Sequence, residues 1–192
     1  IKIQSIKDKS AYNLKNSKYI IPKYEKKILF DEANLFCDWY IKKNLSKKLR
    51  SKFIREFKKV LRELLLRLKL KNDTFVHRDF HVSNLMLVNN EIGVIDNQDA
   101  LIGNQAYDLA SLVDDVRLKT SKKFKYKIYN FFIKKKKKLD KKKFKRDFEI
   151  LSILRNLKII GIFTRLAIRD KKKKYLKLIP YAWKLINLRI NQ

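Results

Sequence analysis

The stretch FVHRDFHVSNLMLVNNEIGVIDNQDA, residues Phe75–Ala100, decides how this chain folds. It places Asp79, Asn84 and Asp96 among short apolar runs, in a chain that is otherwise rich in Lys, Ile and Leu. Two of those runs lie between Asn84 and Asp96 and are joined by Asn-Asn-Glu, which is typical of a β-hairpin. Because a short hairpin returns its two ends to the same place, we expect the three polar side chains to converge.

The converging side chains would offer oxygen atoms to a hard cation. Mg²⁺ usually binds one or two carboxylates together with the phosphates of a substrate. One of the three groups would remain free to act as a base. The alternative is a zinc site at His77 and His81, but these are the only two His residues and they lie in an expected loop. They also lack the Glu of a zinc-binding His-Glu-x-x-His pattern, so we reject this alternative.

The order of these residues resembles the catalytic and metal-binding loops of the protein-kinase-like enzymes. HRDFHVSN, residues 77–84, has His-Arg-Asp followed by Asn at the spacing of the catalytic loop. The metal-binding Asp-Phe-Gly is replaced by Asp96-Asn97-Gln98, with Asp99 next. This Asp-x-x-Asp pattern is similar to the aminoglycoside phosphotransferase branch, and so is YDLASLVDD at 107–115.

Three further stretches narrow the resemblance: LFCDWY from Leu35, VIDNQDA from Val94 and RNLKIIGIFTRLAIRD from Arg155. Together they are similar to the bacterial kinases that phosphorylate the anomeric hydroxyl of N-acetylmuramate and N-acetylglucosamine in cell-wall recycling. The resemblance implies a cytoplasmic enzyme that uses ATP and Mg²⁺ and acts on a small sugar. Aminoglycoside, choline and homoserine kinases of the same superfamily remain open as alternatives. An aminoglycoside kinase would need an acidic pocket for its acceptor, and this basic chain fits that requirement less well.

The resemblance also implies a role for each residue of the motif. Asp79 would be the catalytic base, or would orient the acceptor hydroxyl. Asn84 and Asp96 would hold Mg²⁺ and, through it, the nucleotide. Since phosphoryl transfer depends on positioning and charge neutralisation, the loss of one such oxygen ligand should be severe.

Two residues would support this loop. His77 is expected to pack beneath it, and Asp108 of the Tyr-Asp-Leu pattern would hydrogen-bond its backbone. Asp115, farther along the same helical stretch, is expected to tolerate replacement.

The resemblance offers candidate contacts to the sugar at Asp38, Asp99 and Arg155. An Arg suits the lactyl carboxylate of muramate, because its guanidinium can bind a carboxylate through two hydrogen bonds. The alternative is that Arg155, Lys158 and Arg165 form a solvated face of a helix.

The rest of the chain is expected to be helical. Apolar spacing predicts one helix over 26–44 and a second helix, capped by Ser51, with an apolar stripe over 54–68. The polar residues Lys71–Asp73 are expected to close that second helix. Further helices are predicted over Tyr107–Leu118, over Phe148–Ile168 and after Pro180. The fold class is therefore mainly α with a small β-hairpin, and the resemblance implies the helical C-terminal lobe of the protein-kinase-like fold.

The domain organisation follows from the same resemblance. We expect residues 1–24 to be the end of a linker from an N-terminal lobe, and residues 25–192 to form the kinase-like C-terminal lobe. An N-terminal lobe would carry the Lys and the loop that hold the phosphates of ATP, and neither is found before the motif. For that reason we expect residues 1–192 alone to lack kinase activity.

The chain carries 49 Lys and Arg against 19 Asp and Glu, a formal net charge of +30. Such a charge would attract nucleic acid, anionic lipid or phosphorylated small molecules. We prefer a codon-usage explanation, since residues with AT-rich codons are all frequent and Lys far outnumbers Arg. A basic RNA- or membrane-binding protein on an inactive kinase scaffold remains a second hypothesis, but such a scaffold is expected to lose Asp79 or Asp96.

Cysteine content and hydropathy indicate the cellular compartment of the protein. Cys37 is the only cysteine, so an intrachain disulfide is impossible and a reducing cytoplasm fits. No apolar run approaches the roughly 18 to 20 residues that a bilayer span needs, so we expect no membrane partner. The sequence gives no indication of the oligomeric state.

Overall fold

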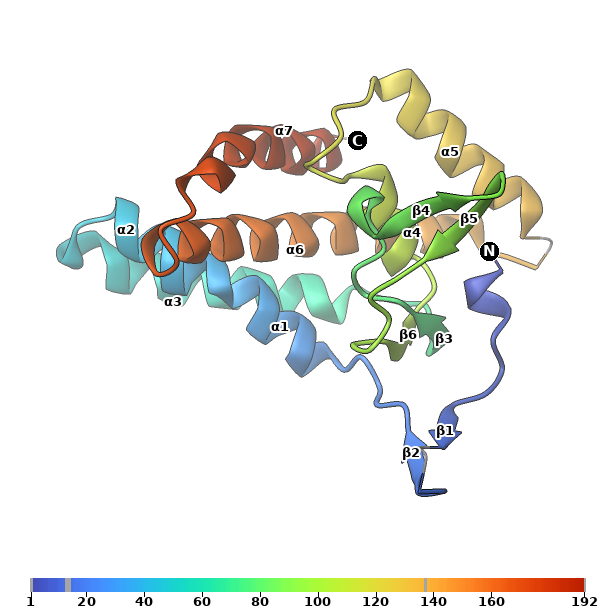
Figure 1. The fold of residues 1–192 in the computed structure, drawn as a ribbon. Coiled ribbons are helices and arrows are strands. Elements are labelled where there is room, and N and C mark those ends of the chain that lie inside the picture. The colour runs from blue at the N-terminus through green and yellow to red at the C-terminus, as the bar shows by residue number, and fades with distance from the viewer. Residues whose placement is uncertain (1, 13–14, 137, 192) are drawn as a thin grey trace. The chain divides into compact units, whose positions relative to one another are not determined.

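A computed structural model describes residues 2–12, 15–136 and 138–191. The chain divides into two compact units (Figure 1). Unit 1 comprises Ile1–Glu25 and Lys69–Phe148, and unit 2 comprises Lys26–Leu68 and Glu149–Gln192. In the described ranges, none of the helices combines the length and the apolar character required to cross a membrane.

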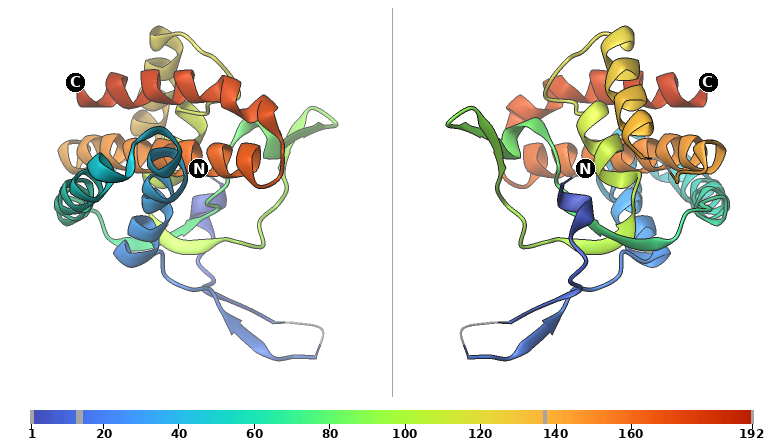
Figure 2. Two further views of the ribbon diagram at one scale, coloured as in Figure 1. Left: turned by 90° about the vertical axis from the view of Figure 1, so that its left-hand side faces the viewer. Right: turned by 90° about the vertical axis from the view of Figure 1, so that its right-hand side faces the viewer.

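Unit 1 contains all the strands that the structure describes, arranged as two-stranded antiparallel ribbons (Figure 1). The pairs are β1 (Ser10–Tyr12) with β2 (Lys18–Ile20), β3 (Asn72–Val76) with β6 (Leu101–Asn104), and β4 (Leu85–Val88) with β5 (Glu91–Val94). The β1–β2 ribbon projects away from the rest of unit 1 in both views of Figure 2. The predicted mainly α fold with a small hairpin is confirmed.

The β4–β5 hairpin is tighter than the sequence predicts. Val88 pairs with Glu91, so Glu91 belongs to the strand and only Asn89 and Asn90 form the turn. Both Asn residues have left-handed backbones, with φ of 49° and 60°. A two-residue type I′ turn needs positive φ at both positions, and Asn tolerates this better than most residues.

The pairing of β3 with β6 was not predicted. Asn72 and Asp73 were expected to close a helix, but they open a strand instead. Residue 102 is also bonded to the segment before α1, since Tyr24 N donates to Ile102 O and Ile102 N donates to Pro22 O, each at 2.8 Å. The last residues of the expected linker thus add a third, parallel backbone neighbour to this ribbon.

The helical elements of unit 1 follow the strands. They are η1 (Ile3–Ser5), η3 (Val82–Asn84), α4 (Tyr107–Val113), α5 (Lys122–Lys135) and the part of α6 (Lys141–Ile168) up to Phe148. Helix α4 ends at Val113 rather than at Leu118, because buried Asp114 and Asp115 leave the helical path there. Helix α6 begins at Lys141 rather than at Phe148. Its first turn is solvated and lacks an apolar period, and it is capped by Asp140 Oδ1, which accepts from Lys143 N at 3.0 Å.

One buried carboxylate joins distant parts of unit 1. Asp147 is fully buried and accepts hydrogen bonds from Lys69 N at 3.0 Å and Leu70 N at 2.8 Å. It also accepts from Asn104 Nδ2 at 2.7 Å, so it ties the start of β3 to the end of β6. Without it, the buried Asn104 Nδ2 would lose its acceptor, which is costly in the interior.

Unit 2 is built from helices. They are α1 (Lys26–Leu35), the π-helix η2 (Phe36–Ile41), α2 (Lys42–Asn44), α3 (Lys47–Leu66), α6 from Glu149, η4 (Lys173–Leu178) and α7 (Ile179–Ile190). The helix predicted over 26–44 is confirmed, with a π-helical interruption, and so is the helix at Pro180. The expected cap at Ser51 is wrong, because α3 begins after Ser46, whose extended backbone (ψ 156°) starts the helix.

The π-helix lies where α1 meets α6. A Cβ on Gly161 of α6 would lie 2.4 Å from Leu35 C and 2.6 Å from Phe36 N, so the two backbones approach within glycine distance. Phe36 packs against Trp183, with ring centroids 5.6 Å apart. Burial, assisted by the adjacent Asp38 carboxylate, raises the pKa of the Cys37 thiol to about 11, so this thiol is neutral at physiological pH.

Replacing Gly161 with Ala should destabilise unit 2. Ala is favoured over Gly in a helix by about 1 kcal/mol, but the new methyl group would overlap backbone atoms that cannot move aside. We expect a net loss of about 1–3 kcal/mol in the free energy of unfolding, measured by urea denaturation.

Gly93→Ala is the matched control. The nearest atom to its Cβ, outside its chain neighbours, is Met86 O at 3.8 Å, an ordinary contact. Equal unfolding free energies for the two variants would show that the close approach at Gly161 does not constrain the fold.

Candidate functional site

Asp108, in the first turn of α4, hydrogen-bonds the backbone of the loop that follows β3. This buried carboxylate accepts hydrogen bonds from His77 N (2.8 Å, Oδ2) and Arg78 N (3.1 Å, Oδ1). Arg78 has φ of 74°, a left-handed conformation that is uncommon for a residue with a side chain. The two hydrogen bonds satisfy amides that no longer pair in the β3–β6 ribbon, so Asp108 fixes the direction of the loop.

His77 joins the loop to the far end of the hairpin. Its ring is buried, and Nε2 lies 3.0 Å from Ile95 O, to which it donates a hydrogen bond. Ile95 N in turn donates to Asn84 O at 3.1 Å. The start of the loop and the exit of β5 are thereby fixed to each other.

Asn84 lies at the centre of the site. Its side-chain Nδ2 donates to the backbone oxygen of Asp79 at 3.0 Å and to Asp96 Oδ2 at 3.3 Å. Asp96 has φ of 68°, which turns its carboxylate back towards Asn84, and its Oδ1 accepts from Gln98 Nε2 at 2.6 Å. The structure therefore brings Asn84, Asp96 and the backbone of Asp79 together.

Asp79, Asn84 and Asp96 differ in which side-chain atoms could contact a ligand. The Asp79 carboxylate is half-buried and makes no hydrogen bond within the described residues, so it can accept a proton. The Asn84 carbonyl oxygen and the exposed Asp96 carboxylate offer hard oxygen donors. In the part of the chain that the structure describes, no three His, Cys, Asp or Glu side chains form a metal site by themselves. A cation at Asn84 and Asp96 would need further oxygen atoms from a bound molecule, as Mg²⁺ takes from phosphates.

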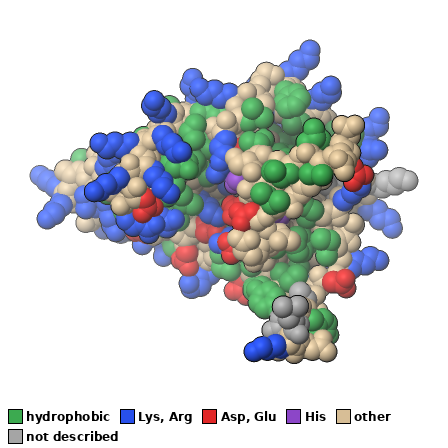
Figure 3. Space-filling view, viewed as in Figure 1, with side chains coloured by type: hydrophobic (Ala, Val, Ile, Leu, Met, Phe, Trp, Pro, Cys, Tyr) green, Lys and Arg blue, Asp and Glu red, His purple; other side chains and the backbone are tan. Residues whose placement is uncertain are grey.

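The surface around the site is exposed. Figure 3 shows acidic side chains gathered beside the apolar surface of the β4–β5 hairpin. Leu87 and Ile92 of the hairpin are 74% and 70% exposed, so these apolar side chains face solvent.

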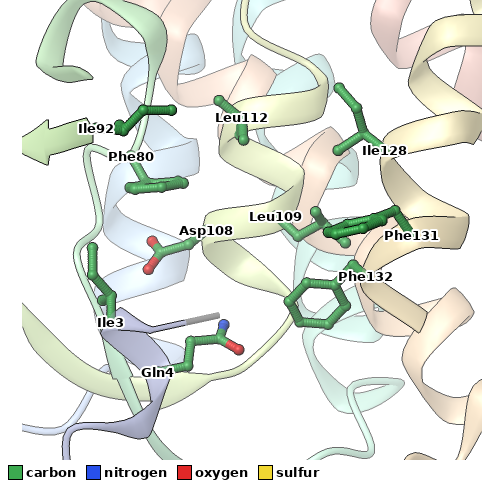
Figure 4. Close-up of a pocket in the computed structure, with 10 residues that line it drawn as sticks. All are labelled: Ile3, Gln4, Phe80, Ile92, Asp108, Leu109, Leu112, Ile128, Phe131 and Phe132. Atoms are coloured by element: carbon green, nitrogen blue, oxygen red, sulfur yellow. The ribbon is translucent and has the colours of Figure 1, made fainter. Parts of the chain in front are cut away.

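A cavity of about 410 Å³ lies on the other side of Asp108 (Figure 4). Its walls are mainly apolar and come from η1, α4, α5, Ile92 of β5 and the loop residue Phe80, which lies beside Ile92 and across the cavity from Phe131. Its lining contains no Lys or Arg, so it offers phosphates no cation.

The candidate sugar contacts are divided between the two units, with Asp99 in unit 1. Asp99 is on the exposed turn after Asp96 and makes no hydrogen bond within the described residues, so the structure does not bond it to Asn84. Asp38 and Arg155 belong to unit 2. Asp38 accepts from Asn34 Nδ2 at 2.9 Å and is 3.4 Å from Lys42 Nζ.

Comparison with known proteins identifies the family. A family described as "Phosphotransferase enzyme family" matches residues 22–126, which include the whole loop, the hairpin and α4. The chain belongs to this phosphotransferase family.

Relatives of this phosphotransferase chain share one name. Proteins of Neisseria meningitidis and Pseudomonas aeruginosa are 35% and 33% identical to it, each over 84% of this chain. A third, from Caulobacter vibrioides, is 32% identical over 57% of the chain. All three are named N-acetylmuramate/N-acetylglucosamine kinase. The match covers 50%, 49% and 31% of the respective relatives, so the chain spans about half the length or less of the curated relatives it matches.

One residue of this phosphotransferase site was missed from the sequence. Asp115 is buried, and its Oδ2 accepts from Val82 N in the loop at 3.1 Å. Its Oδ1 also accepts from Arg117 N at 3.1 Å. The expectation that Asp115 tolerates replacement therefore conflicts with its contacts. The sequence feature that could have indicated this role is the pair of acids in VDD at the end of a short apolar helix.

Asp108→Ala should lower the stability of unit 1. It leaves the buried amide of His77 and the partly buried amide of Arg78 without an acceptor, and loss of the acceptor of a buried amide costs about 1–3 kcal/mol. We expect the free energy of unfolding to fall by at least about 2 kcal/mol in urea denaturation.

Asp73→Ala serves as the matched control, because Asp73 is exposed and, among the described residues, its side chain bonds only its neighbour Thr74. Its effect should stay within about 0.5 kcal/mol. A similar loss in both variants would mean that Asp108 does not hold the loop.

Proposed function

We propose that this protein transfers the terminal phosphoryl group of ATP to the anomeric hydroxyl of N-acetylmuramate and N-acetylglucosamine. The observation that carries the proposal is the carboxylate of Asp79, which has no hydrogen-bond partner among the described residues and lies on the loop beside Asn84 and Asp96. The chain belongs to a phosphotransferase family, and its relatives named above are kinases of these two sugars by name. We assign the reaction to cell-wall recycling in the cytoplasm.

Asp79 acts as the base or orients the acceptor hydroxyl in this proposal. Its carboxylate carries no hydrogen bond from the described residues, so both oxygens can receive the proton of a sugar hydroxyl. The hydrogen bonds of Asp108 and His77 keep the loop in place. Positioning of this kind matters because small displacements of a reacting group can slow transfer greatly.

The donor atoms at Asn84 and Asp96 fit Mg²⁺. One amide oxygen and one exposed carboxylate match its preference for few protein ligands together with phosphate oxygens. When bound, the ion neutralises charge on the transferring phosphate. We place the nucleotide base against the exposed apolar surface of the β4–β5 hairpin, next to Asn84. Asp38 and Asp99 remain proposed contacts to the sugar.

The protein, expressed from its complete reading frame, should convert either sugar and ATP into the sugar 1-phosphate and ADP. Phosphorus NMR identifies the product, because an anomeric phosphate couples to the anomeric proton. Blocking the anomeric oxygen with a methyl group should abolish turnover. Phosphorylation at another hydroxyl, or turnover only with an aminoglycoside, choline or homoserine, would place the protein elsewhere in the superfamily.

Two substitutions separate the proposed roles in the site. Asp79→Ala should lower kcat by at least about 10²-fold, the typical contribution of a positioned base, and leave nucleotide affinity within about threefold. Asp96→Ala should abolish Mg²⁺-dependent nucleotide binding, because it removes the only carboxylate bonded to Asn84 among the described residues. Asp73→Ala is again the control. Turnover of Asp79→Ala within a few-fold of wild type would remove Asp79 from the mechanism.

A further inference from the structure

The segment of unit 2 in which α2 is followed by α3 is strongly basic. Residues 42–53, which we call the α2–α3 corner, carry six Lys and Arg side chains and neither Asp nor Glu. Figure 3 shows Lys and Arg gathered over this end of unit 2, where Figure 1 labels α2. Because the corner has no acid of its own to offset them, these cations attract anions to this surface.

Four of the six cations have no partner in the part of the chain that the structure describes. They are exposed there and form neither a hydrogen bond nor an ion pair, and they are Lys43, Lys47, Lys48 and Lys52. A fifth, Lys42, lies 3.4 Å from Asp38. The four unpaired ammonium groups are therefore available to an external anion.

The sixth cation, Arg50, fixes the shape of the corner. Its Nη2 donates hydrogen bonds to Lys42 O at 2.6 Å and to Leu45 O at 3.2 Å. These bonds join the start of α3 to α2 and to the residue that follows it. The corner is thus ordered before a ligand arrives, which reduces the entropy lost on binding.

An apolar groove of about 390 Å³ lies on the same corner. Leu45, Leu49 and Phe53 line it, together with Lys52 and Glu56. Leu49 is 60% exposed and Phe53 is 38% exposed. They are four residues apart on α3, so their side chains lie on one face of the helix. The corner therefore presents apolar side chains and unpaired Lys residues side by side.

The combination of these two features selects one kind of partner. Codon usage accounts for the number of Lys residues but not for unpaired Lys around an apolar groove. A second copy of the chain would bring six cations against six. Nucleic acid would meet the cations but would leave Leu45 and Leu49 without an apolar contact. A bilayer with anionic headgroups satisfies both, because Lys reaches the phosphates while apolar side chains enter below them.

We propose that the α2–α3 corner docks the protein on the surface of an anionic lipid bilayer. Leu49 and Phe53 enter the boundary between headgroups and acyl chains, and the four unpaired Lys residues bind lipid phosphates. Such a contact lies in the plane of the surface and needs no spanning helix. The nearest acid along α3, Glu56, is 3.3 Å from Arg55 and is neutralised by it.

Vesicle flotation of the protein, expressed from its complete reading frame, tests the proposal. Wild type should float with vesicles of phosphatidylcholine mixed with phosphatidylglycerol, but not with vesicles of phosphatidylcholine alone. Added salt should weaken the binding, since it screens the attraction between Lys and the headgroups.

Two double variants separate the apolar and the charged contribution. Leu49→Ser with Phe53→Ser should lower the affinity for anionic vesicles at least about tenfold, because two apolar side chains no longer leave water. Lys48→Gln with Lys52→Gln should also lower it at least about tenfold, because each Lys near an anionic surface contributes to binding. All four side chains are exposed, so both variants should melt close to wild type.

Matched controls make the same kinds of change outside the corner. Leu66→Ser with Ile190→Ser removes two apolar side chains of unit 2 that are 66% and 63% exposed. Lys122→Gln with Lys123→Gln removes two exposed charges from α5 in unit 1. Vesicle affinity of both controls should stay within about threefold of wild type, because exposed charges outside the contact are largely screened.

The proposal fails if wild type does not float with anionic vesicles, or if the corner and control variants lose equal affinity. Binding to an RNA homopolymer without vesicle binding, lost only in the Lys variant, would make the corner a nucleic-acid surface instead. A dimer in light scattering that only the Ser variant breaks would assign it to a second copy. If the Ser variant melts below wild type, the Lys variant decides, since it leaves the apolar side chains in place. Sugar phosphorylation in solution should be equal in all variants, so vesicle binding is tested independently of the proposed function.

Discussion

The arrangement of unit 1 depends on one carboxylate that accepts two backbone amides. Asp108 bonds the amides of His77 and Arg78 and so stabilises the left-handed turn at Arg78, a conformation that costs about 1–2 kcal/mol. That turn takes the chain out of β3 and directs Asp79 towards Asn84. Asp115, just beyond the other end of α4, holds Val82 farther along the same loop. Helix α4 and the residues that directly follow it thus fix the loop at two points.

Some of the acids of this basic chain are buried in its interior. Asp108, Asp115 and Asp147 are buried and accept backbone amides, and buried Asp114 pairs with Lys125 at 3.3 Å. Buried cations, namely Lys125, Arg155 and Arg189, nearly balance these carboxylates. The surface therefore carries most of the formal charge of +30, which favours the approach of anions such as nucleotides.

Local patterns in the sequence predicted the hairpin, the main helices and the convergence of Asn84 with Asp96. These features depend on apolar spacing and turn residues within a few positions. The β3–β6 ribbon could not be predicted in this way, because polar Asn72 and Asp73 carry no strand pattern. Its ends are joined by Asp147, 78 residues after Lys69, where α6 begins. The contact of Asp115 with Val82 is also long-range, and the role of Asp79 in chemistry rests on resemblance and on its free carboxylate.

The hydrogen bonds of the site form a closed ring. His77 bonds Ile95, Ile95 bonds Asn84, Asn84 bonds the backbone of Asp79, and the chain returns from Asp79 to His77. In a ring, each hydrogen bond limits the geometry available to the others, so the contributions of these bonds to stability are coupled. The effects of changing two of them will not sum, because the first change already releases the restraint on the second. Only His77 and Asn84 enter this ring through side-chain atoms, since Ile95 and Asp79 contribute backbone groups. The geometry of the site is therefore sensitive to replacement at these two positions, whereas the residue type at position 95 is not constrained by the ring.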